Sequence, residues 1–213
     1  MPRKKAIRIA AFAALPNTFE ADPKRRKDWV VQHFHNTHST VLELGCGKGE
    51  YALAIAEMFP EKNVVGVDRN AARLWRAAST ALSCSLANVA FLQCNIAGID
   101  EYFLPGSVSE IWLTFSDPFP RDRDAKHRLT APEFLARYRR VLVPGGIMHI
   151  KTDDPDLWHF SRDTVLAGGG VVDVSIPDLY AVSAADPLLA VQTTFEKKHL
   201  AAGKKIFYLR WHW

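Results

Sequence analysis

The chain contains 213 residues, of which 48% are hydrophobic and 23% are charged, and its net charge is +4. A chain of this length can bury one full core but not two, so we expect one domain with an N-terminal extension. No apolar run approaches the roughly 20 residues that span a membrane, so we expect no membrane association.

The cysteine and histidine patterns argue against a disulfide-stabilised fold and against a metal site. The three cysteines, Cys46, Cys84 and Cys94, are odd in number and contain no C-x-x-C pair. They predict neither a disulfide framework nor a zinc site, and they fit a cytoplasmic protein. Three histidines lie within residues 33–38, but acids and cysteines at ligand spacing are missing around them, so we expect no metal.

The first 38 residues are basic, and we expect them to form an N-terminal arm and helix ahead of the main domain at residues 39–213. Their start imitates a signal peptide, because the basic residues 3–5 precede small apolar residues. However, Arg8 interrupts the apolar run, and the small-x-small site at residues 11–13 would cut inside it. We therefore expect the segment to be retained.

Short β-rich runs alternate with helical patterns along the middle of the chain. After the first strand, residues 52, 55, 56 and 59 follow the i, i+3, i+4, i+7 face of a helix. Strand and helix in alternation predict an α/β fold with a doubly wound, mostly parallel sheet. The expected strands are residues 41–44, 64–67, 89–92, 111–115 and 147–150.

The end of the chain departs from this alternation. Two further strands, at residues 171–176 and 206–211, are separated by a connection without a strong helical period. Such a late pair predicts an antiparallel edge strand on a seven-stranded sheet. A connection of about 30 irregular residues in a compact domain is usually functional. This one contains T-T-F-E at residues 193–196.

Three alternating glycines, Gly45, Gly47 and Gly49, follow the first strand in the run V-L-E-L-G-C-G-K-G-E-Y. Glycine at this position lets a ligand approach the backbone. The run is not a P-loop, because Gly rather than Ser or Thr follows the Gly-Lys pair. Its spacing also departs from G-x-G-x-x-G, and Glu50 would put a negative charge where a pyrophosphate binds. We therefore expect a cofactor without phosphates, bound at Gly45 and Gly47.

Polar side chains follow the ends of successive predicted strands. Glu43 lies within the first strand, where a buried acid needs a cationic partner. Asp68 ends the second strand and is placed to accept both hydroxyls of a ribose, although a helix N-cap is the alternative. Asn95 follows the third strand and is placed to bind a base edge. An acid for an amino group, an acid for a ribose and an amide for adenine together indicate S-adenosylmethionine as cofactor.

The segment at residues 111–128 reads I-W-L-T-F-S-D-P-F-P-R-D-R-D-A-K-H-R. An apolar strand ends at Asp117, which is followed by Pro118 and Pro120, and a run of mixed charge begins after it. The basic residues of this run are Arg121, Arg123, Lys126 and Arg128. An acid on a rigid turn beside a positive surface predicts a binding site for a polyanion, held through its phosphates.

With these residues together, the chain resembles the bacterial tRNA (guanine-N7) methyltransferases from about Asn17 onward. The motif L-E-L-G-C-G-K-G-E is common to many methyltransferases, whereas F-S-D-P-F-P with its basic tail, K-T-D and T-T-F-E are specific to this family. The resemblance implies a Rossmann-like class I fold and methyl transfer from S-adenosylmethionine to N7 of a guanine in the tRNA variable loop. It places cofactor contacts on Glu43, Asp68, Asn95 and Asp117, and substrate contacts on Arg121, Asp153, Thr193, Thr194, Phe195 and Glu196.

Several of these positions depart from the family pattern. Asn95 stands where the family has Asp, which keeps hydrogen bonding to adenine and removes a charge. Ser116 and Phe119 replace a proline and a tryptophan, and Arg121 replaces a lysine. Arg keeps the phosphate-binding charge and Phe keeps a stacking face. Loss of the proline loosens the turn that aims Asp117.

The expected roles follow from the chemistry of guanine N7, which has an exposed lone pair. No proton leaves before attack, so we expect Asp117 to position the reactants rather than to act as a base. An ordinary β-turn is the alternative. Asp153 is expected to contact the base or ribose, with a helix N-cap as the alternative. Residues 193–196 are expected to close over the guanine, although Glu196 has a solvent ion pair with Lys197 and Lys198 as its alternative.

The basic clusters predict how an RNA would be held. We expect the N-terminal arm, disordered until RNA arrives, and residues 123–128 to contact tRNA phosphates. No obligatory protein partner is expected, and the protein is a monomer or a homodimer. The alternatives are a small-molecule methyltransferase, which has no use for basic clusters, and an RNA-binding homologue that has lost catalysis. A nicotinamide oxidoreductase is disfavoured by the glycine spacing.

Overall fold

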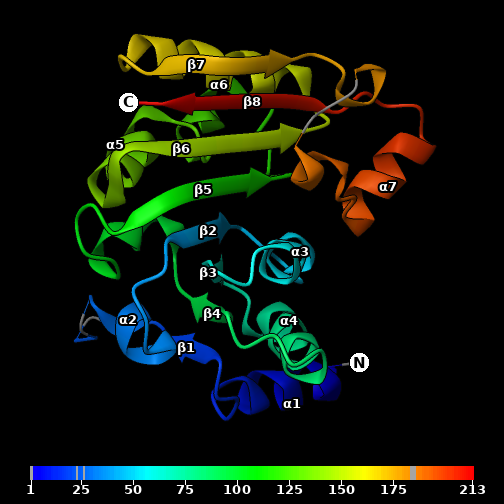
Figure 1. The fold of residues 1–213 in the computed structure, drawn as a ribbon. Coiled ribbons are helices and arrows are strands. Elements are labelled where there is room, and N and C mark those ends of the chain that lie inside the picture. Colours follow the sequence, from blue (N-terminus) through cyan, green and yellow to red (C-terminus); the bar gives the residue numbers. More distant parts are fainter. Residues whose placement is uncertain (1, 23, 26, 183–185) are drawn as a thin grey trace.

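The computed structural model describes residues 2–22, 24–25, 27–182 and 186–213. One sheet runs through this part of the chain, with strand order β1-β4-β3-β2-β5-β6-β8-β7 (Figure 1). Its strands are Thr18–Glu20 (β1), Thr40–Leu44 (β2), Asn63–Asp68 (β3), Val89–Gln93 (β4), Val108–Thr114 (β5), Leu142–Thr152 (β6), Val171–Ile176 (β7) and Phe207–His212 (β8).

The pairing confirms a doubly wound, mostly parallel sheet. The strands from β1 to β6 pair in parallel, and β8 is antiparallel to both β6 and β7. The antiparallel strand therefore lies between β6 and β7 rather than at the edge. The sheet has eight strands instead of the expected seven, because the short segment Thr18–Glu20 pairs with β4.

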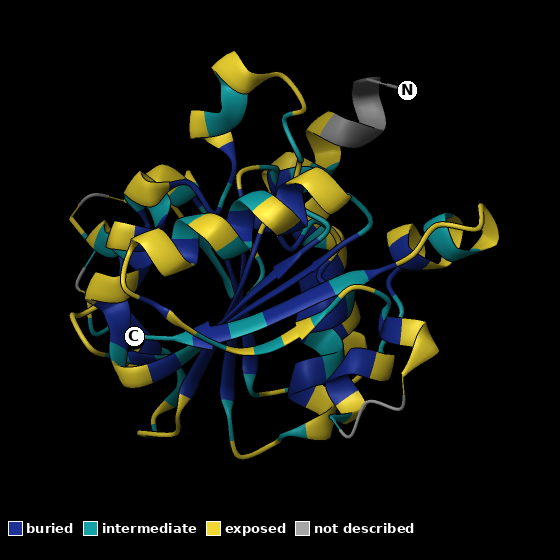
Figure 2. Ribbon diagram, turned by 90° about the horizontal axis from the view of Figure 1, so that it is seen from above, coloured by how far each residue is buried: buried dark blue, intermediate teal, exposed yellow. Residues whose placement is uncertain are grey.

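Helices cover both faces of the sheet, and buried residues gather along its strands (Figure 2). On one face, α5 and α6 contribute Leu135, Tyr138 and Leu157 to the core. On the other, α3 and α4 contribute Ile55 and Leu74. The α-helices are Pro2–Phe12 (α1), Trp29–Phe34 (α2), Glu50–Met58 (α3), Ala71–Ser83 (α4), Pro132–Val141 (α5), Pro155–Ala167 (α6) and Thr194–Ala201 (α7), and the 3-10 helices are Ile96–Glu101 (η1), Asp122–His127 (η2), Leu179–Ala181 (η3) and Pro187–Ala190 (η4).

Helix α4 shows why these segments fold as they do. Its apolar residues recur on one stripe, and Leu74, Ala77 and Ala81 are fully buried. The side chain of Asn70 accepts hydrogen bonds from the backbone N–H groups of Ala72 and Arg73 and so caps the first turn. Helix α4 follows β3 directly, as the predicted alternation of strand and helix requires.

The N-terminal segment packs against the rest of the chain. Phe12 at the end of α1 is fully buried in the same cluster as α4, and Trp29 of α2 donates from Nε1 to the carbonyl oxygen of Tyr102 at 2.9 Å. Phe12 and Trp29 thus share the core of the rest of the chain, while the order of the arm without RNA stays a prediction. The boundary between residues 38 and 39 stays a prediction. Basic residues that lie outside the described side chains are Arg3, Lys4, Lys5 and Arg26.

Candidate active site

The sheet reverses its strand order beside β2, which has β3 on one side and β5 on the other. In doubly wound sheets, ligands bind outside the carboxyl ends of the strands at such a switch point. In Figure 1 the carboxyl ends of β2, β5 and β6 point to the same side, where α3 and α7 lie. The polar residues predicted at strand ends therefore meet at one edge, and this edge is the candidate active site.

Glu43 bridges the two strands at the switch point. Its side chain is 1% exposed. One carboxylate oxygen accepts a hydrogen bond from Thr114 of β5 at 2.6 Å, and the other accepts from the backbone N–H of Ala52 in α3 at 2.8 Å. We expected a cationic partner for this acid, but a hydroxyl and an amide satisfy it. Burial raises the pKa of Glu43 to about 7, although both hydrogen bonds lower it.

The substitution Glu43→Gln should change how the free energy of unfolding depends on pH. Between the ordinary pKa of 4.5 and the folded value of about 7, the folded protein holds a proton that the unfolded chain has lost. The stability that this proton contributes is full at low pH and is lost as the pH rises through this window. The free energy of unfolding of the wild type should therefore fall, relative to Glu43→Gln, by on the order of 3 kcal/mol. Urea unfolding at several pH values measures this, and parallel profiles would contradict it.

The glycine loop between β2 and α3 has a backbone that favours glycine. Gly45, Gly47 and Gly49 have φ of +78°, +56° and +67°. A Cβ atom at Gly49 would lie 2.7 Å from Cβ of Ala77, so this glycine is needed for packing, whereas a Cβ at Gly47 would meet nothing within 4 Å. The loop is therefore packed at Gly49 and open at Gly47, where we expect the cofactor.

Asp68 at the end of β3 holds the glycine loop. Its Oδ2 accepts from the backbone N–H of Gly47 at 2.9 Å, and its Oδ1 accepts from the N–H of Asn70 at 2.8 Å. The helix cap that we considered for Asp68 belongs to Asn70 instead. Each carboxylate oxygen accepts more than one hydrogen bond, so both can also bind a ribose hydroxyl.

Asn95 lies at the rim of a cavity of about 430 Å³. It is exposed, and its side-chain oxygen caps η1 by accepting from the N–H of Ala97 at 3.1 Å. The side-chain amide N–H₂ is left to donate to a base. Arg69, which follows Asp68, lines the same cavity, so the ribose and base positions predicted from the sequence are neighbours.

The loop after β5 has an unusual backbone. Phe115 and Phe119, with φ of +51° and +44°, adopt the left-handed region that bulky residues avoid. Between them, Asp117 is exposed, and its Oδ1 accepts from the N–H of Phe119 at 3.2 Å. The side-chain oxygen of Ser116 is buried and has no hydrogen-bond partner among the described residues. The strained backbone of Phe115 and Phe119 and the unsatisfied hydroxyl of Ser116 thus lie next to Asp117. Such features are common at functional sites.

Arg128 holds this loop through hydrogen bonds to its backbone. It is 7% exposed. Its guanidinium donates to the carbonyl oxygens of Pro118 and Phe119 at 2.9 and 3.1 Å and lies over the ring of Phe160. We expected Arg128 to contact tRNA phosphates, and this was wrong. By contrast, Arg121 is exposed, and its Nε lies 2.6 Å from the carboxylate of Asp124.

Asp153 follows β6 and is held by the segment that carries α7. Its Oδ2 lies 2.5 Å from Nζ of Lys204 and 3.2 Å from Nδ1 of His199. The helix cap that we considered for Asp153 belongs to Asp154, which accepts from the N–H of Leu157. The ring of His199 also stacks on Phe115 at 6.0 Å, so this segment contacts the ends of both β5 and β6.

The T-T-F-E stretch forms the start of α7. Thr193 caps the helix, because its hydroxyl accepts from the N–H of Glu196 at 3.2 Å. Thr194 hydrogen-bonds to Glu50, and Phe195 is 61% exposed. Glu196 is fully buried. These four residues therefore point in different directions.

Glu196 forms an ion pair with Lys151, which is also fully buried, at 2.8 Å. The other oxygen lies 3.0 Å from the same ammonium, and Tyr180 donates its hydroxyl to Glu196 at 2.8 Å. We expected Glu196 to contact guanine or to pair with Lys197 and Lys198 in solvent, and the structure corrects both expectations, because Glu196 is buried against Lys151. Lys151 also donates to the carbonyl oxygens of Leu189 and Val191, so it holds the connection between β7 and β8.

The structural roles of three polar residues of this edge were not predicted from the sequence, namely those of Thr114, Lys151 and Arg128. Thr114 looked like an ordinary strand residue, and Arg128 was hidden in a run of charges. Lys151 did carry a signal, because a lysine inside an apolar strand needs a buried partner. Burial lowers its pKa, and the charge of Glu196 opposes that shift.

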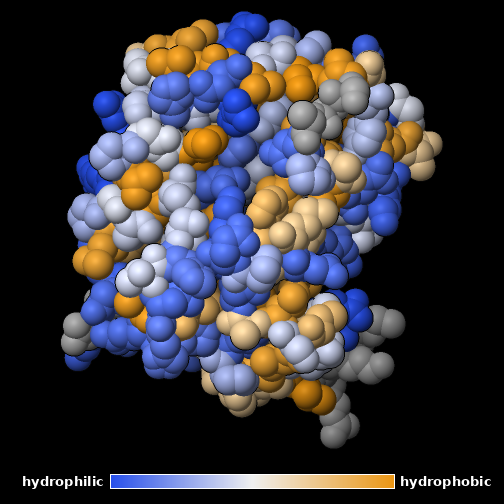
Figure 3. Space-filling model, viewed as in Figure 1, coloured by the Kyte–Doolittle hydropathy of each residue, from blue (hydrophilic) through white to orange (hydrophobic). Residues whose placement is uncertain are grey.

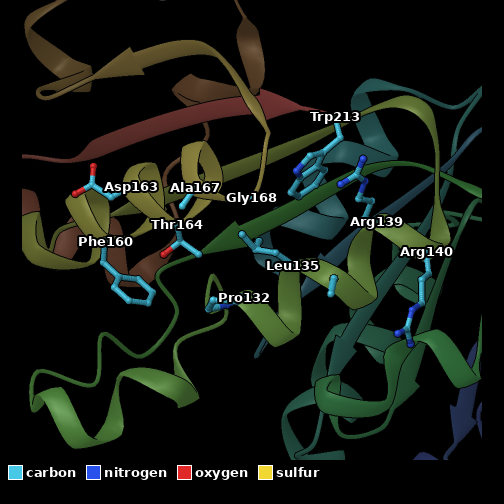
Figure 4. A pocket seen from close by; sticks show the side chains of 11 residues that line it. Pro132, Leu135, Arg139, Arg140, Phe160, Asp163, Thr164, Ala167, Gly168 and Trp213 are labelled. Atoms are coloured by element: carbon cyan, nitrogen blue, oxygen red, sulfur yellow. The ribbon is translucent and has the colours of Figure 1, made fainter.

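A second cavity lies away from this edge, between α5 and α6 (Figure 4). Its volume is about 650 Å³, and its walls include Leu135, Phe160 and Trp213. It contains none of the residues predicted for cofactor or substrate. On the surface seen in Figure 3, hydrophobic residues form separate patches with hydrophilic residues between them.

Neither a metal site nor a membrane span was found in the part of the chain that the structure describes. No group of three or more His, Cys, Asp or Glu side chains there could hold a metal ion. No helix in those residues combines the length and the apolar character that crossing a membrane requires.

Known proteins share both the sequence and the fold. A family model described as "Putative methyltransferase" matches residues 37–209. A tRNA (guanine-N(7)-)-methyltransferase of Bacteroides fragilis is 39% identical over 99% of this chain and 86% of its own length. A tRNA (guanine-N(7)-)-methyltransferase of Christiangramia forsetii is 41% identical over 91% of this chain and 85% of its own length.

The fold is also shared with a protein of much lower sequence identity. The crystal structure of the 16S rRNA methyltransferase KamB superposes with a TM-score of 0.65 at 15% identity, covering 88% of this chain and 94% of that one. This match supports the fold alone. The sequence relatives are closer, and they confirm the resemblance seen in the motifs. The chain belongs to the tRNA (guanine-N7)-methyltransferase family.

Proposed function

We propose that the protein transfers the methyl group of S-adenosylmethionine to N7 of a guanine in the variable loop of tRNA. The observation that carries this proposal is the meeting of two sets of residues at the switch point. Asp68 and the glycine loop lie on one side, beside Asn95. Asp117 and Asp153 lie on the other, at the ends of β5 and β6.

The residues on the first side fit S-adenosylmethionine. The space beside Gly47 is open, and the acids around it disfavour a phosphate while accepting hydroxyl and ammonium donors. Asp68 would bind the ribose, and Asn95 would bind adenine. Glu43 holds the loop and the strand in place through Ala52 and Thr114. The sulfonium supplies an activated methyl group when it is bound.

The residues on the second side would orient the guanine. N7 needs no deprotonation, so the main task is alignment, which can lower the barrier by roughly 7 to 11 kcal/mol. Asp117 keeps one oxygen on the N–H of Phe119 and offers the other to N1–H or the 2-amino group of guanine. Its negative charge also offsets the positive charge that develops on the methylated base.

Further contacts are proposed around Asp117. The buried hydroxyl of Ser116, which has no hydrogen-bond partner among the described residues, lies directly beside Asp117. Phe195 is exposed on α7 and offers an aromatic face to a base that leaves its stack. Arg121 binds a phosphate, and Asp153 binds the base or ribose. Thr193 and Glu196 act indirectly, because they fix the start of α7.

The tRNA backbone would contact the exposed basic residues of η2 and Arg121, which directly precedes this helix. Replacing Arg121, Arg123 and Lys126 with glutamine should reduce the slope of log affinity against log salt by about 3, one for each lost phosphate contact. Filter binding between low and physiological salt measures this slope. The matched control is Arg76→Gln, an exposed arginine on α4, which should leave the slope unchanged. An unchanged slope in the triple variant would exclude η2 from the interface.

The direct test is methylation of unmodified tRNA. The protein is incubated with S-adenosylmethionine and tRNA transcript, and nuclease digestion with mass spectrometry detects 7-methylguanosine and its position. Methylation of a small-molecule panel without methylation of tRNA would support a different substrate. Cofactor binding without product would indicate a homologue that has lost catalysis.

We further propose that the protein acts in the cytoplasm, where its tRNA substrate is found, as a monomer or homodimer without an obligatory partner. Light scattering of the purified protein, together with its activity in the absence of other proteins, tests this. Activity that appears only after cell extract is added would contradict it.

A further inference from the structure

Helix α7 contacts three separate parts of the candidate active site. Near its end, His199 contacts Phe115 and Asp153. In its first turn, Glu196 pairs with Lys151 of β6. At its first residue, Thr194 contacts Glu50, the residue directly after the glycine loop. Figure 1 shows α7 beside the carboxyl ends of β5 and β6.

The contact between Glu50 and Thr194 joins the cofactor side of the site to the guanine side. One carboxylate oxygen of Glu50 accepts from the backbone N–H of Thr194 at 2.5 Å, and the other accepts from the Thr194 hydroxyl. Both bonds are charge-assisted, and the first uses an N–H group that the helix itself leaves unpaired. The contact thus combines two strong hydrogen bonds across 144 residues of sequence.

The glycine loop transmits its position to Glu50. Asp68 holds the loop at Gly47, and Glu43 holds α3 at Ala52, so the loop is fixed at both ends by acids of the sheet. Glu50 is the first residue of α3 and lies between these two points. This backbone segment therefore joins the cofactor site to the carboxylate of Glu50 and, through it, to Thr194.

We propose that Glu50 is a positioning residue that couples cofactor binding to tRNA binding through Thr194. A bound cofactor fixes the glycine loop, Glu50 then fixes the start of α7, and the adjacent Phe195 is held ready for the guanine. The inference rests on the proposed function. Because coupling is reciprocal, bound tRNA strengthens cofactor binding by the same factor.

The test compares tRNA affinity with and without saturating S-adenosylhomocysteine, so that no methyl transfer occurs during the measurement. In the wild type, the cofactor product should tighten tRNA binding by about fivefold or more. Glu50→Ala should bring this ratio close to one, and Thr194→Ala, which keeps the backbone N–H bond to Glu50 and loses only the hydroxyl bond, should lower it part of the way. Thr194→Ser, which keeps the hydroxyl, should restore it. The matched control is Glu57→Gln, an exposed carboxylate on the same helix, which should keep the wild-type ratio.

A double variant distinguishes coupling from simple loss of structure. Glu50→Ala combined with Thr194→Ala should lower the ratio no further than Glu50→Ala alone, because Glu50→Ala already removes both hydrogen bonds to Thr194. The affinity for S-adenosylhomocysteine in the absence of tRNA should stay close to wild type in all variants. A wild-type ratio in Glu50→Ala would overturn the proposal. The proposal would also be overturned if Glu50→Ala lost as much affinity for S-adenosylhomocysteine without tRNA as with it, because Glu50 would then only shape the loop.

The proposed function fails by a different result. It fails if the wild type makes no 7-methylguanosine, whereas the coupling is read from binding alone and needs no product. The two failures are therefore separable in one set of proteins.

Discussion

Replacing Asp117 with asparagine should lower the rate of tRNA methylation by about 100-fold or more, the loss seen when one preorganised charge or donor is removed from a transition-state site. Asparagine keeps an oxygen that can accept from the N–H of Phe119, as Asp117 does at 3.2 Å, so the loop should keep its shape. What is lost is the negative charge facing the base. The cofactor should bind with nearly wild-type affinity, since Asp68 and the glycine loop are unchanged.

Single-turnover methylation with excess enzyme is the appropriate measurement, because product release can limit repeated cycles. Cofactor affinity is measured separately by calorimetry. The matched control is Asp122→Asn, an exposed carboxylate in the neighbouring η2, which should methylate at the wild-type rate. A near-normal rate for Asp117→Asn would remove Asp117 from the mechanism and leave it as a turn residue.

Removing one partner of the buried pair between Lys151 and Glu196 should cost about 3 to 5 kcal/mol of stability. Both side chains are fully buried, and their charged atoms are 2.8 Å apart, so Lys151→Met leaves an unpaired carboxylate in the core. Adding Glu196→Leu should recover most of this loss, because an apolar pair of similar volume has no charge to desolvate. Urea unfolding of the wild type, both single variants and the double variant measures the effect.

An exposed ion pair provides the contrast. Lys204 pairs with Asp153 but remains half exposed, so Lys204→Met should cost less than about 1 kcal/mol. If Lys151→Met were as mild as Lys204→Met, the buried pair would not hold the connection between β7 and β8. The double variant offers a second readout, since it restores stability but not the hydrogen bonds of Lys151 to Leu189 and Val191. It should therefore methylate more slowly than the wild type.

Most of the sheet could be predicted because apolar runs alternate with amphipathic stretches, as in α4. Strand β1 escaped prediction because three residues carry no period, and its pairing with β4 depends on the whole fold. Helix α7 escaped because its apolar residues form no clear stripe. Its position depends on a cap at Thr193 and on the buried Glu196.

The positions of site residues at strand ends could be predicted, because the sheet topology fixes them. The side chains that pair with these residues could not be predicted, because they come from distant parts of the chain. Parallel strands end at one edge, so Asp68 and Asn95 could be placed there from the sequence. The partner of Glu43 could not, because the chain folds a hydroxyl from β5 against it. Likewise, nothing in a dense charged run distinguishes Arg128, which is buried, from Arg123, which is exposed.

The backbone at Phe115 and Phe119 has a consequence for efforts to engineer this protein. Each left-handed residue with a side chain costs roughly 1 to 2 kcal/mol, and glycine at Phe119, with its φ of +44°, would avoid that cost. A screen for heat resistance would therefore favour glycine there. The same change would free the turn that aims Asp117, and a screen for turnover would reject it. Thermal selection and kinetic selection should thus enrich different residues at this one loop.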